Sequence, residues 1–587
     1  MRSNNNILLL LEDFSKLDIE NNYLSVLPIS YELKKKLKIK EINFVSPTRK
    51  QVLDKYEFCN KIYKKIIKKL LKLFNEIHTV NFKEKEFEII IGYWLKNYIY
   101  QSVKIFQQLE YIFLNEKVFS IIITDYDKFS FIKEDTQSFA VAHALDLEWH
   151  YCFFSKIIHH FEKDFSKKII IKSIESNKGS YPKKIKDEEN FYKKFFYYML
   201  NFTKNTNKAF ISHTYLPFFK EKKLELIFNQ IPSYYKSSHS QNNLPTNTEL
   251  RKRYSSLLIP KYKNIESFIF SNIFNFIPKS FLENFKYNLK MSQSNLFPKN
   301  PSFIFTSSLN FFDEIFKVYA AFQLKNKKPI FIGQHGNNYF SRIHNNYLPE
   351  LNYATKFLSW GYESAKFKNV IGLFNFKTLK QNIKRKNSSR NKIVIFFDFL
   401  NNVSDNLFYN PQEITASLSR IDKFLINLKK EIKDNAVLRL NYTFYKKIYG
   451  QIYSDYYKNF KIEIDDGKKD VSKILDQAKL CIFNYDSTGF LENICNNVPS
   501  IMLLDEDYLN FISDDFKKKY ENLISSKLIF FKNYQLANHV NEIWDEVDIW
   551  WESKAVQNSL KLFNSRFNEK GNCKSLQLMS TIIKKNI

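Results

Sequence analysis

The segment FIFTSSLNFFDEIFKVYAAFQLKNKKPIFIGQHG, residues 303–336, decides the fold class of this protein. It starts with a short apolar run typical of a buried strand, continues with apolar residues at helical spacing, and ends with a second apolar run. A strand, a helix and a strand in this order form a parallel βαβ unit. The segment therefore predicts an α/β protein built on parallel sheets.

The same alternation continues toward the C-terminus. Short apolar runs predict strands at 356–361, 392–399, 436–442, 460–465, 479–485 and 499–504, with helices near 411–432, 470–478 and 489–497. A polar, basic stretch at 380–392 has the composition of a linker. We therefore expect two doubly wound halves that face a cleft. Ligands of such folds bind outside the carboxyl ends of the strands, so the loops at those ends are the candidate sites.

The region before residue 300 has a different pattern. Helical spacing predicts helices between about 60 and 113 and between 143 and 165, and residues 225–260 are polar and interrupted by proline, as in a loop. An aromatic and basic run at 190–200 has residue types that stack on bases, but its helical spacing favours burial in a core. This region is therefore expected to be rich in helices.

Length and composition exclude several classes of protein. With 587 residues, of which 44% are hydrophobic and 26% charged, the chain is too long for one small binding module and too apolar for wholesale disorder. A net charge of +29 suggests a nucleic-acid or a membrane-surface partner. However, only 10 of the 90 basic residues are Arg, which leaves 80 Lys, and Lys, Asn, Ile, Phe and Tyr share AT-rich codons. Base composition therefore explains most of the charge, and no nucleic-acid partner is expected.

Cysteine usage and hydropathy indicate the compartment. The chain has five scattered cysteines, with no CxxC pair, which disfavours a disulfide framework or a zinc site. A run of four leucines near the N-terminus is too short for a signal peptide, and no apolar stretch reaches the length of a membrane span. The sequence therefore predicts a soluble, cytoplasmic protein.

The turn GQHGNN (333–338) is the most unusual loop in a chain with only 10 glycines. Gly333 and Gly336 bracket His335 directly after a predicted strand, and glycine permits a sharp turn or a close approach to a ligand. His335 is then placed to act as an acid or base, or to bind an anion. The alternative is a histidine whose nitrogens are satisfied within the turn. Arg342, a few residues later, is a candidate anion ligand or a member of a surface ion pair.

The segment YDSTGFLEN (485–493) joins a predicted strand to a predicted helix. Ser487 or Thr488 is expected to cap the helix, and Gly489 opens it, so that unpaired N–H groups point toward the cleft and favour a phosphate. Glu492 follows one turn later, within reach of a ribose hydroxyl. The alternative is a capping box in which Glu492 and the cap residue bond each other.

Two further clusters carry weaker signals. Arg439 stands at the end of the predicted strand LRLNY, where it either binds phosphate with two hydrogen bonds or extends its charge from a sheet edge. DLEWH (146–150) gathers Asp146, Glu148 and His150 near a helix start, where one of them is a candidate base on the acceptor side. Capping and packing are the alternative for that cluster. Its two carboxylates do not share a helix face, which disfavours a metal site.

Several of these segments together resemble one family of transferases, first recognised in leptospiral O-antigen gene clusters. The matching segments are 73–78, 92–99, 148–158, 306–339, 470–505 and 543–563. The sequence departs from the family pattern at two places. Members commonly have a further glycine after the QHG turn, where this chain has Asn337 and Asn338. A Tyr-Pro-His-Asp stretch is common after the position of Arg439, and here it reads Asn441 to Phe444.

The resemblance implies a GT-B-like α/β fold with two Rossmann-type halves facing a cleft. Its domains are expected at 1–290, an α-rich elaboration of the acceptor-side half; 291–385, the core of that half; 386–545, the half that binds the nucleotide sugar; and 546–587, C-terminal helices that pack back across both. The implied enzyme is a glycosyltransferase that needs no metal or other cofactor. His335 and Glu492 are its catalytic candidates.

The resemblance also implies the partners of this enzyme. The donor, a nucleotide sugar, is expected to contact Gln334, Gly336, Asn337, Arg439, Asp486, Ser487, Thr488 and Gly489. A CMP-linked nonulosonic or Kdo-like acid is one donor subgroup. The acceptor is a surface glycan, free or lipid-linked, and a lipid carrier would make peripheral contact with the inner membrane useful. Two other functions remain open at this point: a CDP-alcohol phosphotransferase of the teichoic-acid type, and a non-catalytic basic protein that binds nucleic acid.

Overall fold

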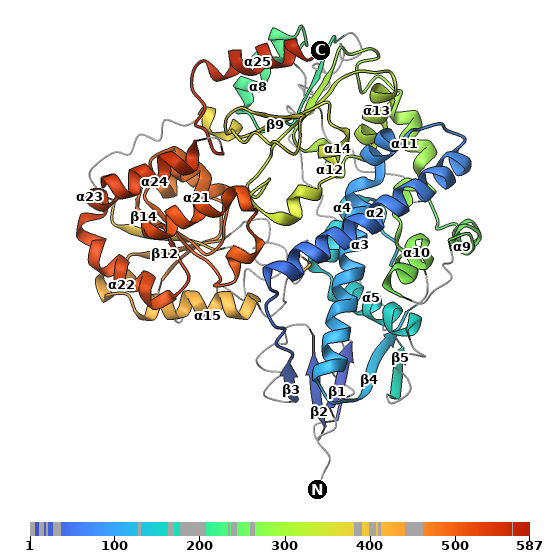
Figure 1. Ribbon diagram of the computed structural model, residues 1–587, viewed down its shortest axis with the longest axis horizontal. Helices are drawn as coiled ribbons and strands as arrows, with labels where there is room; N and C mark the ends of the chain where they lie inside the picture. Colours follow the sequence, from blue (N-terminus) through green and yellow to red (C-terminus); the bar gives the residue numbers. More distant parts are fainter. Residues whose placement is uncertain are drawn as a thin grey trace.

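The computed structural model describes residues 6–10, 17–18, 21–26, 37–126, 129, 131–161, 170–175, 207–232, 235, 244–258, 264–380, 390–397, 407–408, 413–440, 462–565 and 567–587. Three parallel β-sheets with helices against them make up this part of the chain (Figure 1). We name them the N-terminal, central and C-terminal sheets. The expected α/β class is confirmed.

The central sheet contains the segment that decides the fold. Its strand order is β10-β9-β8-β7-β6, and every pair is parallel. The strands are β6 (Phe210–Ile211), β7 (Ile304–Thr306), β8 (Ile330–Gly333), β9 (Lys356–Ser359) and β10 (Val370–Gly372). Between β7 and β8 lie α12 (Leu309–Phe312) and α13 (Glu314–Lys325), which begins at the N-cap Asp313. The βαβ unit read from residues 303–336 is thus present.

The C-terminal sheet has the order β13-β12-β11-β14-β15-β16, again with parallel pairs throughout. This is the 3-2-1-4-5-6 order of a Rossmann fold. The strands are β11 (Lys392–Phe396), β12 (Ala436–Arg439), β13 (Glu463–Asp465), β14 (Ala478–Phe483), β15 (Ser500–Leu503) and β16 (Ile529–Phe530). The helices are α15 (Glu413–Ile426), α16 (Lys430–Lys433), α19 (Val471–Leu475), α20 (Thr488–Cys495), α21 (Asp514–Ser525) and α22 (Asn533–Ile543). Each strand predicted for this half is found.

The N-terminal region is rich in helices, and it also contains a sheet that the sequence patterns did not reveal. Its helices are α2 (Arg49–His78), α3 (Glu84–Asn115), α4 (Thr136–Leu145), α5 (Leu147–His160), α9 (Thr248–Ser256), α10 (Ile265–Phe276) and α11 (Phe285–Ser292). The sheet has the order β3-β2-β1-β4-β5, formed by β1 (Asn6–Leu10), β2 (Asn22–Ser25), β3 (Lys38–Glu41), β4 (Val118–Asp125) and β5 (Ile170–Glu175).

Helix α3 holds the N-terminal region against the central sheet. It is buried on nearly every side and packs on α2, α13, α10, α5 and α14 (Glu350–Tyr353). Trp94, Tyr98 and Phe87 of this helix are fully buried. Its buried residues also include polar ones such as Lys96 and Gln101, so nearly the whole helix lies inside the packed body rather than on its surface. The N-terminal region and the central sheet therefore share one packed body.

The C-terminal helices return toward the central sheet. Helices α23 (Val547–Glu552) and α24 (Lys554–Asn564) lie on the C-terminal half, where α24 packs on α21. The last helix, α25 (Ser575–Lys585), packs on α8 (Phe218–Ile227), which precedes β7. The apolar core around α25 is continuous with the cores of both the central and C-terminal sheets. The predicted linker residues 381–389, the aromatic run at 190–200 and the departure at 441–444 lie outside the described residues.

Candidate functional site

The turn after β8 and the turn after β14 meet between the two halves. The backbone N–H of Asn337 donates to Thr488 Oγ1 at 3.0 Å, and its side-chain amide donates to Asp486 Oδ1 at 2.6 Å. A Cβ added at Gly336 would lie 3.4 Å from Thr488 Oγ1. The loops predicted to carry the chemistry, although about 150 residues apart, are thus in direct contact.

Asp486 is the centre of this junction. Besides Asn337, its carboxylate accepts hydrogen bonds from Tyr508 and from Tyr520, the latter at 2.6 Å. The guanidinium of Arg342 lies 3.9 Å from the Tyr508 ring, close enough for a cation–π contact. Asp486 is 5% exposed, and both of its oxygens are engaged by protein groups. This carboxylate therefore holds the two halves together, and Arg342 is a half-buried part of the junction.

Gln334 shapes the turn that carries His335. Its side chain donates to the Gly336 carbonyl at 2.9 Å and accepts from the Trp360 backbone N–H at 3.0 Å. These two bonds fasten the turn to β9. Asn338 adopts a φ of 71°, in the left-handed region that Gly and Asn tolerate best.

His335 lies at the end of a chain of hydrogen bonds. Its Nδ1 is 2.9 Å from the Tyr339 hydroxyl, which donates to Glu350 Oε1 at 3.1 Å. The ring also packs edge-on against the Phe311 ring, with centroids 4.7 Å apart. The centroid of the Tyr215 ring lies 5.8 Å from that of His335. Burial, and secondarily the nearby Lys377, lower the pKa of His335 to about 4. The imidazole is therefore neutral at physiological pH.

A cavity of about 580 Å³ opens beside His335. Its walls combine aromatic rings with amides and a few charged groups. They come from α3, the segment after β6, the α12 segment after β7 and the loop after β8, and include Tyr93, Lys96, Tyr215, Phe311, Asp313, Asn337 and Tyr339. His335 Nε2 has no hydrogen-bond partner among the described residues, whereas Nδ1 is bonded to Tyr339. The ring nitrogen that remains for a ligand is therefore Nε2. The volume suits a sugar-sized molecule.

The N-terminus of α20 borders the same junction. Ser487 caps the helix by accepting from the Phe490 N–H at 3.0 Å, as expected. The capping box does not form, because the N3 position that it requires is Phe490; Glu492 lies two residues further on and pairs with Lys377 at 3.4 Å. Lys377 also lies 5.1 Å from the Tyr215 ring, so this pair stands close to the wall of the cavity.

The first helical N–H groups of α20, those of Thr488 and Gly489, have no acceptor among the described residues. Orphan donors at a helix start attract anions. A Cβ added at Gly489 would lie 3.1 Å from the Phe483 ring, so a larger residue there would require the ring to shift by a few tenths of an ångström.

Arg439 is engaged elsewhere. Its guanidinium donates to Asp465 Oδ2 at 2.6 Å and to the Lys469 carbonyl at 2.8 Å. Strand β12 is two positions from β14 in the sheet, which separates Arg439 from the α20 turn by roughly 10 Å of backbone. The structure therefore places Arg439 as a fastener of the loop after β13.

The DLEWH cluster belongs to the core of the N-terminal region. Asp146 caps α5 by accepting from the Trp149 N–H at 3.0 Å and pairs with Lys133 at 3.5 Å. His150 is 1% exposed and bonds the His143 carbonyl through Nε2 at 2.6 Å; burial lowers its pKa to about 3. Glu148 stands in the first turn of the same helix. None of the three lines the cavity beside His335.

Sequence reasoning missed Tyr339, Glu350, Lys377 and Tyr215. Tyr339 follows His335 by four residues, a spacing that could have drawn attention. The other three come from segments that no motif marks. Only their convergence in space identifies them.

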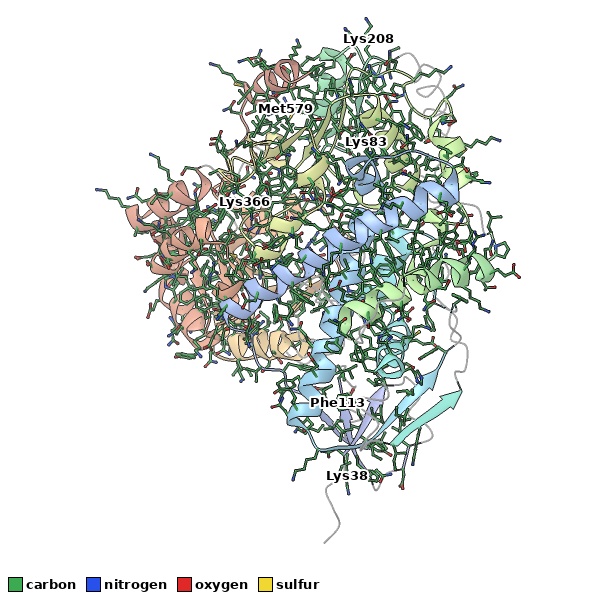
Figure 2. All side chains as sticks on the ribbon, turned by 45° about the vertical axis from the view of Figure 1, so that its right-hand side comes forward. Lys38, Lys83, Phe113, Lys208, Lys366 and Met579 are labelled. Atoms are coloured by element: carbon green, nitrogen blue, oxygen red, sulfur yellow. The ribbon has the colours of Figure 1, made fainter. Side chains whose placement is uncertain are left out.

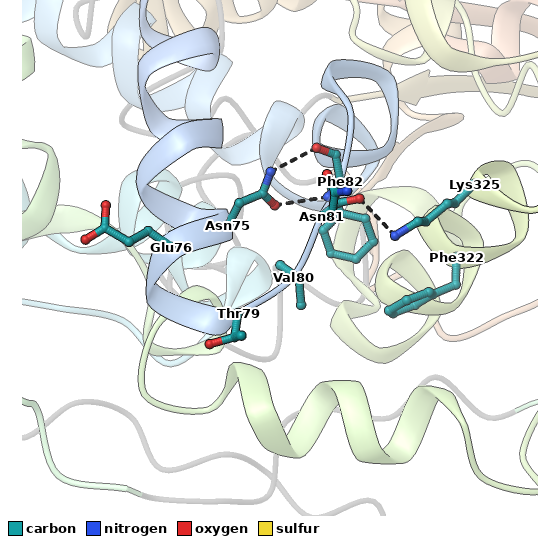
Figure 3. Close-up of a pocket in the computed structure, with 8 residues that line it drawn as sticks. All are labelled: Asn75, Glu76, Thr79, Val80, Asn81, Phe82, Phe322 and Lys325. Atoms are coloured by element: carbon teal, nitrogen blue, oxygen red, sulfur yellow. Dashed lines mark hydrogen bonds between the residues drawn. The ribbon is translucent and has the colours of Figure 1, made fainter.

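Other parts of the described chain offer weaker candidates. A cavity of about 570 Å³ lies where α2 ends and faces α13 (Figure 3). There Asn75 bonds the backbone of Phe82 through both amide atoms, and Lys325 donates to the Asn81 carbonyl at 2.9 Å. Much of the polar lining is thus used within the turn. No group of three or more His, Cys, Asp or Glu side chains in the described ranges could hold a metal ion.

None of the described helices combines the length and apolar composition needed to cross a bilayer.

Comparison with known proteins gives a family and several distant structural likenesses. No curated protein gives a significant match. The structure of the wall teichoic acid polymerase TagF is 13% identical, with 74% of this chain and 97% of TagF covered at a TM-score of 0.34. The Staphylococcus aureus MnaA–UDP structure is 10% identical, covering 79% of this chain and 96% of MnaA at a TM-score of 0.32. The UDP complex of a UDP-glucose:anthocyanidin 3-O-glucosyltransferase is 9% identical. The match covers 65% of this chain and 100% of that chain at a TM-score of 0.34.

The family model of the LIC12162 family transferases matches residues 29–583, so the chain belongs to that family. This confirms the family resemblance seen in the sequence and establishes the protein as a transferase. The family match carries that conclusion, and the distant structural likenesses do not add to it.

Proposed function

We propose that this LIC12162 family transferase is a glycosyltransferase that moves a sugar from a nucleotide-activated donor to a hydroxyl of a surface glycan. The observation that carries the proposal is the position of His335. His335 lines a sugar-sized cavity, its Nδ1 is held by Tyr339, and the neighbouring turn presents the N-terminus of α20. An acceptor site and an anion site thus adjoin one neutral imidazole.

His335 is the general base of the proposed reaction. With Nδ1–H donating to Tyr339 and Tyr339 donating to the Glu350 carboxylate, Nε2 carries a lone pair toward the cavity. The acceptor hydroxyl gives its proton to Nε2 as its oxygen bonds the anomeric carbon. The bond from that carbon to the nucleotide phosphate breaks, and the electron pair leaves on the phosphate oxygen. Glu350, whose pKa is raised by burial, accepts from Tyr339 and so fixes the orientation of the hydroxyl that holds Nδ1–H of His335.

The donor phosphates belong at the start of α20. The N–H groups of Thr488 and Gly489 and the ammonium of Lys377 are the donors and the charge available there. Glu492, paired with Lys377, orients that ammonium instead of acting as a second base. Asp486 positions the turn that carries Asn337, and Arg439 stabilises the loop after β13. A CMP-linked acidic sugar is one donor class that suits this basic surrounding, and no resident cofactor or metal takes part in the proposal.

Two measurements test this function. The full chain is heated with CMP, CDP, UDP and GDP compounds, and a ligand that binds only the folded state raises the melting temperature. We expect one nucleotide class to do so; no response from any class would contradict a nucleotide-dependent transferase.

Product analysis then separates the reaction types. A glycosidic bond supports the proposal, whereas a phosphodiester would identify a CDP-alcohol phosphotransferase. His335→Ala is expected to lower transfer by about 100- to 10,000-fold. Glu148→Ala, on the distant DLEWH cluster, is the control. Unchanged transfer by His335→Ala would remove this residue from the chemistry.

A further inference from the structure

Helix α8 exposes an unusual number of large apolar side chains. Phe219 is 83% exposed, Leu226 60% and Phe218 57%. Tyr215, just before the helix, and Ile231, just after it, are 38% and 48% exposed. Five of the 20 exposed large apolar residues found in the described ranges therefore fall between residues 215 and 231. Single exposed apolar residues are ordinary on a soluble protein, but a concentration of them marks a contact surface.

The charges of α8 are sorted between its two sides. Both of its acidic residues bond to neighbouring protein groups. Glu225 is fully buried and pairs with Lys222 at 2.5 Å, and Glu221 accepts hydrogen bonds from the backbone N–H and the hydroxyl of Thr214. Lys220 and Lys223 are exposed. The outward side of α8 is therefore apolar and positively charged, with no exposed acid of its own.

Helix α25 extends this surface. It packs on α8, and both helices lie at the same end of the molecule in Figure 1, near Lys208 and Met579 in Figure 2. The helix contains no acidic residue, and its exposed side chains include Leu578, Lys584 and Lys585. We call the set Phe218, Phe219, Lys220, Lys223, Leu226, Leu578, Lys584 and Lys585 the α8–α25 surface.

We propose that the α8–α25 surface docks this protein on an anionic lipid membrane. Exposed aromatic rings beside lysines are the composition that inserts at the boundary between headgroups and acyl chains. Lysines are attracted by anionic headgroups, whereas phenylalanine rings gain by leaving water. The sorting of the α8 charges points to this occupant, because an apolar protein partner would not require that every exposed charge be positive.

The position of this surface suits the proposed transfer reaction. Tyr215 lines the cavity beside His335 and precedes α8 by only three residues, so the docking helix leads directly to the wall of the cavity. An acceptor carried on a lipid would then reach the cavity without leaving the membrane surface. This consequence rests on the proposed function, whereas the docking itself does not.

The experiment measures flotation of the full chain with vesicles of phosphatidylcholine, with or without about one third phosphatidylglycerol. Because the whole protein carries +29, the variants must separate local docking from general attraction. Lys220→Glu/Lys223→Glu and Lys64→Glu/Lys68→Glu change the net charge equally, and the second pair lies exposed on α2. Phe218→Ala/Phe219→Ala is matched by Leu114→Ala, whose side chain is 83% exposed at the end of α3.

We expect the wild-type chain to bind the anionic vesicles and to bind neutral ones far less. The α8 lysine variant should lose about 30-fold or more in partition, at roughly fivefold per lysine, and the α2 lysine variant only a fraction of this. The phenylalanine variant should lose about tenfold or more, and Leu114→Ala little.

Several results would overturn the proposal: no binding of the wild type to anionic vesicles, equal loss in both lysine variants, or wild-type binding by the phenylalanine variant. A dimer that becomes a monomer in the phenylalanine variant would also overturn it, because a second copy would then be the occupant. None of these measurements needs turnover, so a failure of docking is distinct from a failure of the proposed transferase activity.

Discussion

The substitution Asp486→Asn tests whether this carboxylate holds the two halves together or binds the donor. In the structure it accepts from Asn337, Tyr508 and Tyr520 and is 5% exposed. A hydrogen bond to a charged acceptor contributes about 1 kcal/mol more than one to a neutral acceptor. Three such bonds make the expected loss of stability about 3 kcal/mol. For a cooperative unit of domain size this lowers the melting temperature by roughly 6–12 °C.

The assay is thermal melting of the full chain, with nucleotide affinity measured at a temperature where both proteins are folded. Asp476→Asn, an exposed carboxylate in the same half, is the matched control and should melt like the wild type. If Asp486→Asn also melts like the wild type, the Asp486 carboxylate does not stabilise the junction between the two halves. If it does so while nucleotide affinity falls, Asp486 contacts the donor and our placement of this residue is wrong.

Three further predictions concern the surroundings of His335. Burial raises the pKa of Glu88 from 4.5 to about 7, so its contribution to stability is present below pH 4.5 and is lost as the pH rises through 7. At pH 8 the Glu88→Gln variant should therefore be more stable than the wild type, with a free energy of unfolding up to about 3 kcal/mol higher and a higher melting temperature. At pH 4.5 the two proteins should melt at the same temperature. The same melting temperature for both proteins at both pH values would contradict the raised pKa of Glu88. Tyr339→Phe should lower transfer about tenfold and alter the ring-nitrogen NMR signals of His335, because Nδ1 loses its partner; unchanged signals would remove the relay. Gly333→Ala should lose about 1–3 kcal/mol in a thermal melt, since its Cβ would collide with a serine hydroxyl and a buried phenylalanine ring, whereas Gly336→Ala, with its nearest contact at 3.4 Å, should melt like the wild type.

Local patterns predicted the strands and helices of the central and C-terminal sheets well. Most of their strands are apolar runs bounded by turn residues, and helices such as α13, α15 and α20 could be recognised from their own residues. Strands β10 and β16 and helices α21 and α22 were not predicted. The N-terminal sheet was not predicted, although β1 (NILLL) and β4 (VFSIIITD) are apolar runs, because these strands are separated by two long helices and their neighbours carry a weaker signal. Strand β3 reads KIKE, with two lysines and a glutamate, and is recognised as a strand only through its pairing with β2. Strand β6 has two residues, too few for any periodicity.

In the candidate site, too, features set by neighbouring residues were predicted, and features set by distant residues were not. The position of His335 after a strand, and the helix start at Ser487, follow from residues close together in the chain, and the structure has both. The roles of Asp486 and Arg439 did not follow, because a charged residue at a strand end suits a ligand and a buried partner equally well. Their partners, Tyr508 and Asp465, stand 22 and 26 residues away.

The sequence by itself determined the βαβ architecture, the turn that presents His335 and the family of the chain, since each is written in contiguous residues. Only the tertiary structure decided which charges are committed to protein partners, how Tyr339 and Glu350 hold the imidazole, and which lysines stand beside exposed phenylalanines. The physical reason is that a side chain's hydrogen bonds, burial and pKa depend on groups brought close by packing. Asn337 and Asp486, 149 residues apart, meet at 2.6 Å only because two separate sheets pack with the ends of their strands together.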